Sequence, residues 1–281
     1  MLDSLLRRLL RTPRVDVWRD WYRRYDDNPF AVDPENVSRE RFLALAAGIR
    51  RNDALLATLG ERFGTLPDVE FVDELALATQ VVPKDDGLDW SHGFLLYAAL
   101  TSYLVRMDSD RPVTIFETGT ARGFSAVCMA KALQDAGCAG TILTVDVLHA
   151  ERPLLWNSIA DAEGPKTRLE LLEPWSKLVE DHVVFLRGDV SVALEQLGLS
   201  RIHFAFLDAE HTHDAVRDEL AFVASHQLPG DVIVCDDYTP REFPEIVRAV
   251  DELEATGAYE VWRFASSNAR GYAYLEKSGA D

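Results

Sequence analysis

The sequence predicts an α/β fold in which a seven-stranded, mostly parallel sheet ends in an antiparallel hairpin and follows a helical cap. Three observations carry this prediction. From Val113 onward, short β-branched and apolar runs alternate with helical stretches, which is typical of a parallel sheet with crossover helices. The last two runs are joined only by a short Ser-Asn-Ala-Arg link, which leaves no room for a crossover helix, so they should pair antiparallel. The residues before about position 89 show helical patterning alone.

Each expected strand is a short apolar run bounded by turn residues. The first, VTIFETG, leads into a helix over 124–136, and the second follows a Gly-Cys-Ala-Gly break. A helix that ends near Ala224 separates the fourth and fifth strands, and a helix over 243–255 tolerates Pro244 in its first turn. The seven strands are expected at residues 113–119, 141–147, 183–189, 202–208, 231–237, 259–266 and 271–277.

The chain divides into two predicted regions. Residues 1–88 form a helical cap and oligomerisation region, with helical runs at 38–59 and 72–82, and residues 89–281 form the domain that contains the sheet. Arginines and leucines interleave in the amino-terminal stretch MLDSLLRRLLRTPRV. This pattern favours a helix packed on its own domain or on a partner subunit over a helix at a membrane surface. The sequence therefore favours a homo-oligomer.

The composition narrows the classes of function. With 47 acidic and 29 basic residues, the chain has a formal net charge of −18, so its average field repels nucleic acid. No apolar run reaches the roughly 18 residues that a membrane span needs, and the amino terminus lacks a signal-peptide cleavage site. Cys128, Cys138 and Cys235 lack the paired spacing of disulfides or zinc knuckles. We expect a cytoplasmic protein that acts on a small molecule.

The first strand ends in ETGTARG, a glycine-containing turn between a strand and a helix. Gly119 and Gly123 allow a sharp turn and a close approach of a ligand to the main chain. The spacing is GxxxG rather than GxGxxG, and Glu117 would repel a pyrophosphate but would suit a cationic amino-acid group. The turn therefore favours a sulfonium cofactor over a dinucleotide, with a purely structural turn as the alternative.

Two further strand ends carry candidate cofactor contacts. Asp146 ends the second strand, where an acidic side chain commonly accepts both hydroxyls of a ribose; a solvated strand end is the alternative. Gly188 and Asp189 end the third strand, where the adenine edge would reach. Asp189 is equally suited to cap the helix that begins near Val190, and the two roles are compatible.

Three aspartates end the fourth and fifth strands. Asp208 closes FAFLD, and Asp236 and Asp237 close VIVCDD. Because ligands of open α/β sheets bind outside the carboxyl ends of the strands, these acids should converge on one rim, where they would repel one another without a cation. Oxygen ligands favour Mg²⁺, with Mn²⁺ or Ca²⁺ as alternatives, whereas zinc would want His or Cys. Unfilled carboxylates in a solvated turn are the other interpretation.

His211 follows Asp208 by three residues and is the candidate general base. A position at the start of a helix disfavours the protonated ring, so the imidazole should stay neutral and able to accept a proton. His213 is the competing candidate, and either histidine could instead be a capping or surface residue. Further candidate substrate contacts are Trp90, His92, Tyr238, Thr239 and Arg241.

Over roughly residues 89–281, these motifs resemble the metal-dependent class I S-adenosylmethionine (SAM) O-methyltransferases. The stretch ETGTARGFSAVCMA is similar to the first motif and helix of that family, VD at 145–146 to its ribose acid, and LDAEH with CDD to its metal acids. Catechol O-methyltransferase has a lysine where this chain has His211, and an Asp-Asn pair where it has Asp236 and Asp237. The histidine variant resembles the branch of macrocin and mycinamicin methyltransferases, which methylate sugar hydroxyls of natural products.

The resemblance implies a Rossmann-like class I methyltransferase fold and an in-line methyl transfer to one hydroxyl of a vicinal diol. Under it, His211 and Asp208 are catalytic, and the metal ligands are Asp208, Asp236 and Asp237. A catechol or phenol acceptor is the alternative within enzymes, and a non-catalytic SAM-binding or nucleotide-binding protein is the alternative outside them. The implied cofactor contacts are Glu117, Gly119, Thr120, Gly123, Ser125, Asp146, Gly188, Asp189 and Asp208.

Overall fold

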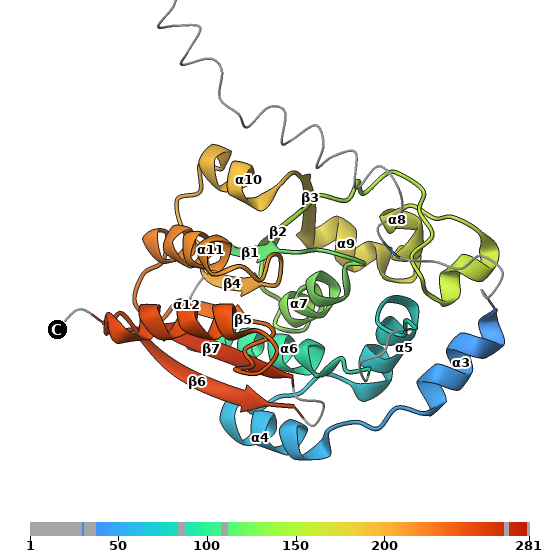
Figure 1. Ribbon diagram of the computed structural model, residues 1–281, viewed down its shortest axis with the longest axis horizontal. Helices are drawn as coiled ribbons and strands as arrows, with labels where there is room; N and C mark the ends of the chain where they lie inside the picture. Colours follow the sequence, from blue (N-terminus) through green and yellow to red (C-terminus); the bar gives the residue numbers. More distant parts are fainter. Residues whose placement is uncertain (1–29, 31–37, 84–87, 108–111, 267–269, 280–281) are drawn as a thin grey trace, which may run out of the picture.

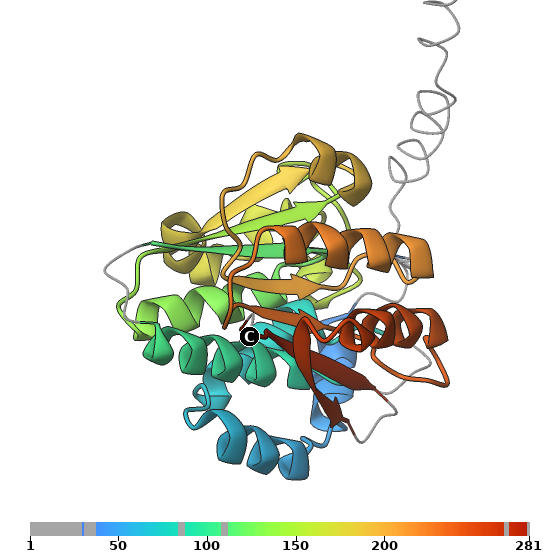
Figure 2. The same cartoon turned by 90° about the vertical axis from the view of Figure 1, so that its left-hand side faces the viewer.

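A single seven-stranded sheet forms the centre of the computed structural model, which describes residues 30, 38–83, 88–107, 112–266 and 270–279 (Figures 1 and 2). The strands are β1 (Val113–Thr118), β2 (Gly140–Asp146), β3 (Val183–Arg187), β4 (Phe204–Leu207), β5 (Val232–Cys235), β6 (Tyr259–Ala265) and β7 (Gly271–Lys277). The longer helices are α3 (Arg39–Ala47), α4 (Asp53–Phe63), α5 (Val69–Thr79), α6 (Ser91–Arg106), α7 (Phe124–Asp135), α11 (His213–Ser225) and α12 (Pro244–Ala255). The shorter ones are α8 (Arg168–Leu171), α9 (Ser176–His182) and α10 (Val190–Gln196), with 3₁₀ turns η2 (Ile159–Glu163) and η3 (Glu173–Trp175).

The strand order is β3-β2-β1-β4-β5-β7-β6, which confirms the seven predicted strands and the antiparallel hairpin. Strands β1 to β5 run parallel, and β7 lies between β5 and β6, antiparallel to both. Several strands end before the predicted residue. The main chain turns away at Gly119 (φ +83°) and at Asp237 (φ +52°), so the candidate glycines and the acid pair lie in loops after β1 and β5, whereas Glu117 lies within β1.

The chain reverses its direction of winding at β1, which creates the crevice that open α/β sheets use for ligands. Strand β1 pairs with β2 on one side and with β4 on the other. The connections that leave β1 and β4 therefore diverge above adjacent strand ends. The glycine turn and the loop after Asp208 border this crevice.

Both faces of the sheet are buried, as expected for parallel strands covered by helices. Helices α4, α6 and α7 contribute to one apolar core, and α11 and α12 contribute to the other (Figure 1). Side chains of β1 alternate between the two: Ile115 belongs to the first core and Phe116 to the second, and neither is exposed to solvent. This double coverage holds the strand ends, and hence the candidate site, in a fixed frame.

The cap region differs from the prediction in its helix boundaries. The run at 38–59, expected as one helical stretch, forms α3 and α4, because α3 ends at Gly48 and the Asn52 side chain accepts a hydrogen bond from the Leu55 N–H (3.1 Å) to begin a new helix. Phe42 of α3 and Leu59 of α4 are buried in the same core as one face of the sheet. The boundary at residue 88 stays a prediction, and the arginine-leucine stretch lies outside the described residues.

No helix in the described ranges combines the length and the apolar character that crossing a membrane requires. Helix α6, an apolar helix of 16 residues, packs against α4 and α7.

Candidate active site

A pocket of about 580 Å³ opens at the carboxyl ends of β1, β2 and β4. This volume lies within the range of about 300–1,000 Å³ that is usual for small-molecule and cofactor sites. Four of the predicted cofactor contacts line it, namely Gly119, Asp146, Asp189 and Asp208. The other lining residues are Phe30, Ala121, Val145, Val147, Leu148, Val190, Ser191, Leu194, Ala209, Glu210, Ala215, Asp218 and Glu219.

The two glycines of the turn are required by the packing of the main chain. A β-carbon on Gly119 would collide with the main-chain carbonyl of Asp208, and one on Gly123 would come within 2.7 Å of the Leu172 side chain. Gly123 also takes φ +89° as the residue that precedes α7. The turn is therefore pressed against the β4 loop on one side and against the β2–β3 connection on the other.

Asp146 is buried at the pocket edge and is held by both of its carboxylate oxygens. Oδ2 accepts the Ala121 N–H (2.6 Å), and Oδ1 accepts the Leu148 N–H (2.7 Å). Burial raises the pKa of Asp146, although the Arg168 guanidinium, 3.4 Å from Oδ2, opposes the rise. Arg168 is almost fully buried and donates from Nε to the Ala121 carbonyl (2.8 Å). Arg168 cannot be recognised from the sequence, because nothing near it in the chain signals a buried cation.

Glu117, predicted to engage the cofactor, is the penultimate residue of β1. It is fully buried, and neither carboxylate oxygen has a hydrogen-bond partner among the described residues. Burial raises the pKa of Glu117 to about 7, with the Ser125 and Thr144 hydroxyls and the Arg168 charge opposing the rise. The Thr120 hydroxyl is hydrogen-bonded to Thr144. Glu117, Thr120 and Ser125 do not line the described pocket.

Asp189, which follows β3, both caps a helix and lines the pocket. Its Oδ1 accepts the Ser191 N–H (2.8 Å) and the Ser191 hydroxyl (2.7 Å), so Asp189 caps α10. The same residue lines the pocket. Gly188 donates its N–H to the Asp146 carbonyl (2.9 Å) and is not among the lining residues.

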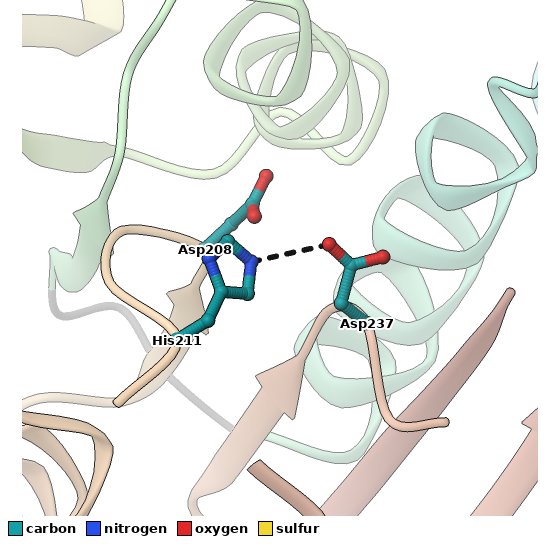
Figure 3. A group of neighbouring side chains, drawn as sticks. All are labelled: Asp208, His211 and Asp237. Carbon is teal, nitrogen blue, oxygen red and sulfur yellow. Dashed lines mark hydrogen bonds and ion pairs between the residues drawn. The ribbon is translucent and has the colours of Figure 1, made fainter. Parts of the chain in front are cut away.

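Asp208, His211 and Asp237 come together at the rim, and Figure 3 shows the imidazole pointing toward the Asp237 carboxylate. One ligand atom from each residue lies within 4.8 Å of the others. His211 Nε2 is 3.2 Å from Asp237 Oδ2, and Asp237 Oδ1 is buried with no hydrogen-bond partner in the described part of the chain. A buried, unpaired carboxylate oxygen beside two further ligand atoms fits a divalent cation.

Asp236, the third predicted metal acid, is placed differently from Asp237. It is buried, and its Oδ1 accepts the Asp237 N–H (2.8 Å). Burial, followed by repulsion from Asp237, raises the pKa of Asp236 to about 7. The compact group in this structure contains His211 and does not include Asp236, and the main chain is left-handed at Asp237, directly after Asp236.

The acids differ in their electrostatic surroundings. Burial and then repulsion from Asp236 and Asp237 hold the pKa of Asp208 well above its usual range. Burial also acts to raise the pKa of Asp237, but the hydrogen bond with His211 and the Arg270 charge outweigh it, so that pKa is lowered. Arg270 belongs to the hairpin link, and no pattern in the sequence relates that link to the acids of another loop.

The structure distinguishes the two candidate bases. The His211 ring stacks on Phe243, with centroids 4.6 Å apart and an angle of 29° between the planes, and reaches the acids. His213 is the first residue of α11, and its Nε2 lies 2.9 Å from Glu252 Oε2 on α12. Only His211 of the two is positioned for chemistry at the acid rim. Phe243 was not singled out from the sequence, because its role depends on the fold of the loop.

Glu219 is a buried carboxyl that no motif in the sequence indicates. It lies on α11, lines the cofactor-sized pocket and also a small hollow beneath Asp208 and His211. Its Oε2 accepts a hydrogen bond from the Thr118 hydroxyl (2.6 Å). Burial raises the pKa of Glu219 to about 8.

The other candidate substrate contacts lie at varied positions. Trp90 donates from Nε1 to Asp73 Oδ1 (3.1 Å) in the cap region, and Tyr238 donates to Asp251 Oδ1 (2.7 Å). His92 lies within α6, parallel to the Phe206 ring at 6.3 Å. Thr239 is buried beside the acid loop, whereas Arg241 is exposed.

Comparison with known proteins agrees with this architecture. Residues 116–238, from β1 to just beyond the acid pair, match a family model described as a methyltransferase domain. No curated protein matches the chain. Among solved structures, the chain is similar to the O-methyltransferase from Bacillus cereus in complex with S-adenosylhomocysteine (SAH), with 15% identity, a TM-score of 0.50, and 87% of this chain and 100% of that chain covered.

Two further similar structures are O-methyltransferases. TomG from Streptomyces achromogenes, involved in tomaymycin synthesis and solved with SAM, has 18% identity and a TM-score of 0.52, with 80% of this chain and 96% of that chain covered. NovP has 16% identity and a TM-score of 0.51, with 74% and 98% covered. The protein thus has a Rossmann-like methyltransferase fold, as predicted, and the matched region contains the acids and all the described pocket-lining residues except Phe30.

Proposed function

We propose that the protein is a SAM-dependent and divalent-metal-dependent O-methyltransferase that methylates one hydroxyl of a vicinal diol on a sugar-containing small molecule. One observation carries this proposal: Asp208 belongs both to the cofactor-sized pocket and to the group that it forms with His211 and Asp237. A methyl donor in the pocket and a hydroxyl at the acids would therefore meet at one residue. The methyltransferase-domain match and the O-methyltransferase neighbours support the same transfer to oxygen.

The charge of the pocket supports a cationic cofactor. Its described lining contains six carboxylate side chains and no lysine, arginine or histidine. Such a surface disfavours the pyrophosphate of a dinucleotide and suits SAM, which supplies a reactive sulfonium methyl when bound. In this assignment Asp146 accepts the ribose hydroxyls, and Gly119 lets the main chain approach the ligand. Glu117 does not line the described pocket, so its role in this assignment is to support the turn from a buried position at the end of β1.

We assign the metal to Asp208, Asp236 and Asp237 and the base to His211. A divalent cation held there would lower the pKa of a substrate hydroxyl, and carboxylates suit Mg²⁺, with Mn²⁺ or Ca²⁺ as alternatives. In this assignment the His211 imidazole takes the hydroxyl proton, and Asp237, which lies 3.2 Å from Nε2, stabilises the resulting imidazolium. The ring stack on Phe243 fixes the plane of the imidazole. In the alternative assignment, His211 Nε2 is itself a metal ligand, as the compact group allows.

The acceptor class rests on His211 together with the Asp236–Asp237 pair. These residues stand where a catechol methyltransferase has a lysine and an Asp-Asn pair, which favours a sugar diol. A catechol presents the same two adjacent oxygens to a cation and is the second candidate. The deciding chemistry is the acidity of the hydroxyl, because an alcohol needs a stronger combination of metal and base than a phenol does.

Calorimetric titration tests the proposal. Full-length protein, treated with a chelator, is titrated with SAH, SAM and NAD, each with and without Mg²⁺ or Mn²⁺. Micromolar binding of SAH and no heat from NAD are expected, followed by metal-dependent transfer of labelled methyl to glycosides in preference to catechols. Binding of NAD in place of SAH would overturn the cofactor assignment. Methyl transfer to catechols alone would overturn the sugar-diol assignment in favour of a catechol acceptor.

We also propose that the protein is cytoplasmic and that residues 1–88 support a homo-oligomer. The arginine-leucine pattern of the amino-terminal stretch supports this proposal. Light scattering on full-length protein and on a chain that begins at residue 38 compares the two masses. A monomeric full-length protein would overturn the proposal.

A further inference from the structure

Among the described residues that line the pocket, Phe30 alone precedes both the sheet and the methyltransferase-domain match. It lines the pocket together with Ala121, Asp146 and Leu148. Ala121 belongs to the glycine turn, Asp146 is the last residue of β2, and Leu148 lies two residues beyond it. Phe30 therefore borders the part of the pocket in which Asp146 is assigned to the ribose.

Two contacts hold the Phe30 ring at this position. The Arg122 guanidinium lies 4.2 Å from the ring centroid, which is the geometry of a cation–π interaction. The Trp156 ring packs on the same side chain, with centroids 5.6 Å apart and planes inclined by 43°. Arg122 and Trp156 are themselves joined, because Arg122 Nε donates to the Trp156 carbonyl (2.7 Å).

These contacts form a rigid support that is independent of the sheet. Trp156 is fully buried in a small apolar cluster with Leu148, Leu154 and Leu171, and Phe30 packs against that cluster. Because Arg122 belongs to the glycine turn, the support connects the turn to the β2–β3 connection. A ring fixed in this way loses little conformational freedom when a ligand arrives, which favours binding.

We propose that Phe30 is a cofactor-binding residue whose ring forms the outer wall for the nucleoside part of the cofactor. The inference rests on the proposed function, since it takes the pocket to be the SAM site. An aromatic face beside a ribose-binding acid suits a purine base or the apolar face of a ribose. Arg122 and Trp156 are positioning residues that hold the ring, and they need not touch the ligand.

The test measures ligand affinity in the full-length protein without metal. Wild type, Phe30→Ala, Phe30→Leu and Phe30→Tyr are titrated with SAH and with 5′-methylthioadenosine, which retains the nucleoside and lacks the amino-acid part. Phe71→Ala is the matched control, because Phe71 also contacts a cationic side chain, Lys131 at 5.8 Å, but does not line the pocket. Circular dichroism and Tm verify that each variant is folded.

We expect Phe30→Ala to weaken both ligands by the same factor, about tenfold, as for loss of an aromatic stacking partner. Phe30→Leu, which keeps most of the packing volume, should weaken both to a smaller extent, whereas Phe30→Tyr and Phe71→Ala should bind as wild type does. Unchanged affinity in folded Phe30→Ala and Phe30→Leu would overturn the inference. A loss for SAH alone would also overturn it, because the ring would then contact the amino-acid part. Failure of wild type to bind SAH would instead refute the proposed function.

Discussion

Gly119 lies so close to the main-chain carbonyl of Asp208 that a single added methyl group could not be accommodated between them. This contact joins the turn that follows β1 to the loop that follows β4. Because Gly119 also takes φ +83°, any side chain there adds backbone strain to the collision. The two halves of the candidate site, cofactor turn and acid rim, are therefore a single packed unit.

Gly119→Ala should damage both halves together. We expect a loss of roughly 3 kcal/mol or more in the free energy of unfolding, together with loss of SAH binding. Gly137→Ala is the matched control, because Gly137 has φ +62° and open space around its α-carbon; it should cost about 1 kcal/mol and leave binding intact. Denaturant titration and calorimetry measure the two quantities. Wild-type affinity in Gly119→Ala would contradict the packed unit.

His211→Gln should slow methyl transfer without weakening cofactor binding. Loss of a general base typically costs about 10²–10⁴-fold in rate, and the side chain does not line the cofactor-sized pocket. His213→Gln is the control, since His213 pairs with Glu252 at the surface. Steady-state kinetics and SAH titration separate the two effects. Wild-type kcat in His211→Gln would remove its assignment as the base.

Metal titration of single variants decides which side chains bind the cation. Asp208→Asn and Asp237→Asn should abolish Mn²⁺ binding, measured by electron paramagnetic resonance, while SAH affinity stays within a few-fold. His211→Gln should retain Mn²⁺ if it is the base and lose it if it is a ligand. Asp236→Asn should lose Mn²⁺ under the proposed carboxylate set. Retention of Mn²⁺ in Asp236→Asn with loss in His211→Gln would establish the Asp208, His211 and Asp237 set instead.

The raised pKa of Glu219 predicts a pH-dependent stability difference. Its folded pKa of about 8 lies above the ordinary value of 4.5, so the folded state holds a proton that the unfolded state releases. The stability that this proton contributes is fully present below about pH 4.5 and is lost as the pH rises toward 8. The Tm of Glu219→Gln should therefore equal that of wild type near pH 4.5. At pH 8.5 it should exceed the Tm of wild type by at least about 2 °C.

The control for this comparison is Glu260→Gln, at an exposed position of β6. Its Tm difference from wild type should be small and equal at the two pH values. The raised pKa of Glu117 also makes stability depend on pH, but it does so equally in wild type and in both variants. The Tm difference between wild type and Glu219→Gln therefore reports on Glu219 alone. Parallel Tm curves for wild type and Glu219→Gln across this pH range would show that the carboxyl is ionised in the folded protein.

Much of the fold and part of the site could be predicted because the relevant signals are local. Apolar runs separated by turn residues define the seven strands, and the short link at 267–270 defines the hairpin. Asp208 and Asp237 could be placed on one rim because the carboxyl ends of parallel strands share an edge. His211 followed from its distance along the chain from Asp208.

The remaining features depend on contacts between distant segments. Arg168 belongs to the site because it donates to the Ala121 carbonyl and lies beside the Asp146 carboxylate. Phe30 belongs to it because its ring contacts Arg122 and lines the pocket. No periodicity or motif encodes such approaches, which follow from how the β2–β3 connection folds back. That His211 and not Asp236 joins Asp208 and Asp237 in the compact group depends on where the side chains of two loops lie, which strand patterning does not reveal.

The position of β7 between β5 and β6 has a consequence for biosynthesis. While the chain emerges from the ribosome, the edge of β5 has no partner until Gly271–Lys277 has followed. The loop after the acid pair depends on the same segment for a main-chain hydrogen bond, because Tyr238 donates its N–H to the Gly271 carbonyl (2.8 Å). The loop that carries Asp237 therefore gains this main-chain partner only after β7 has been made, and a chain that lacks β7 presents an open strand edge to other chains and to chaperones.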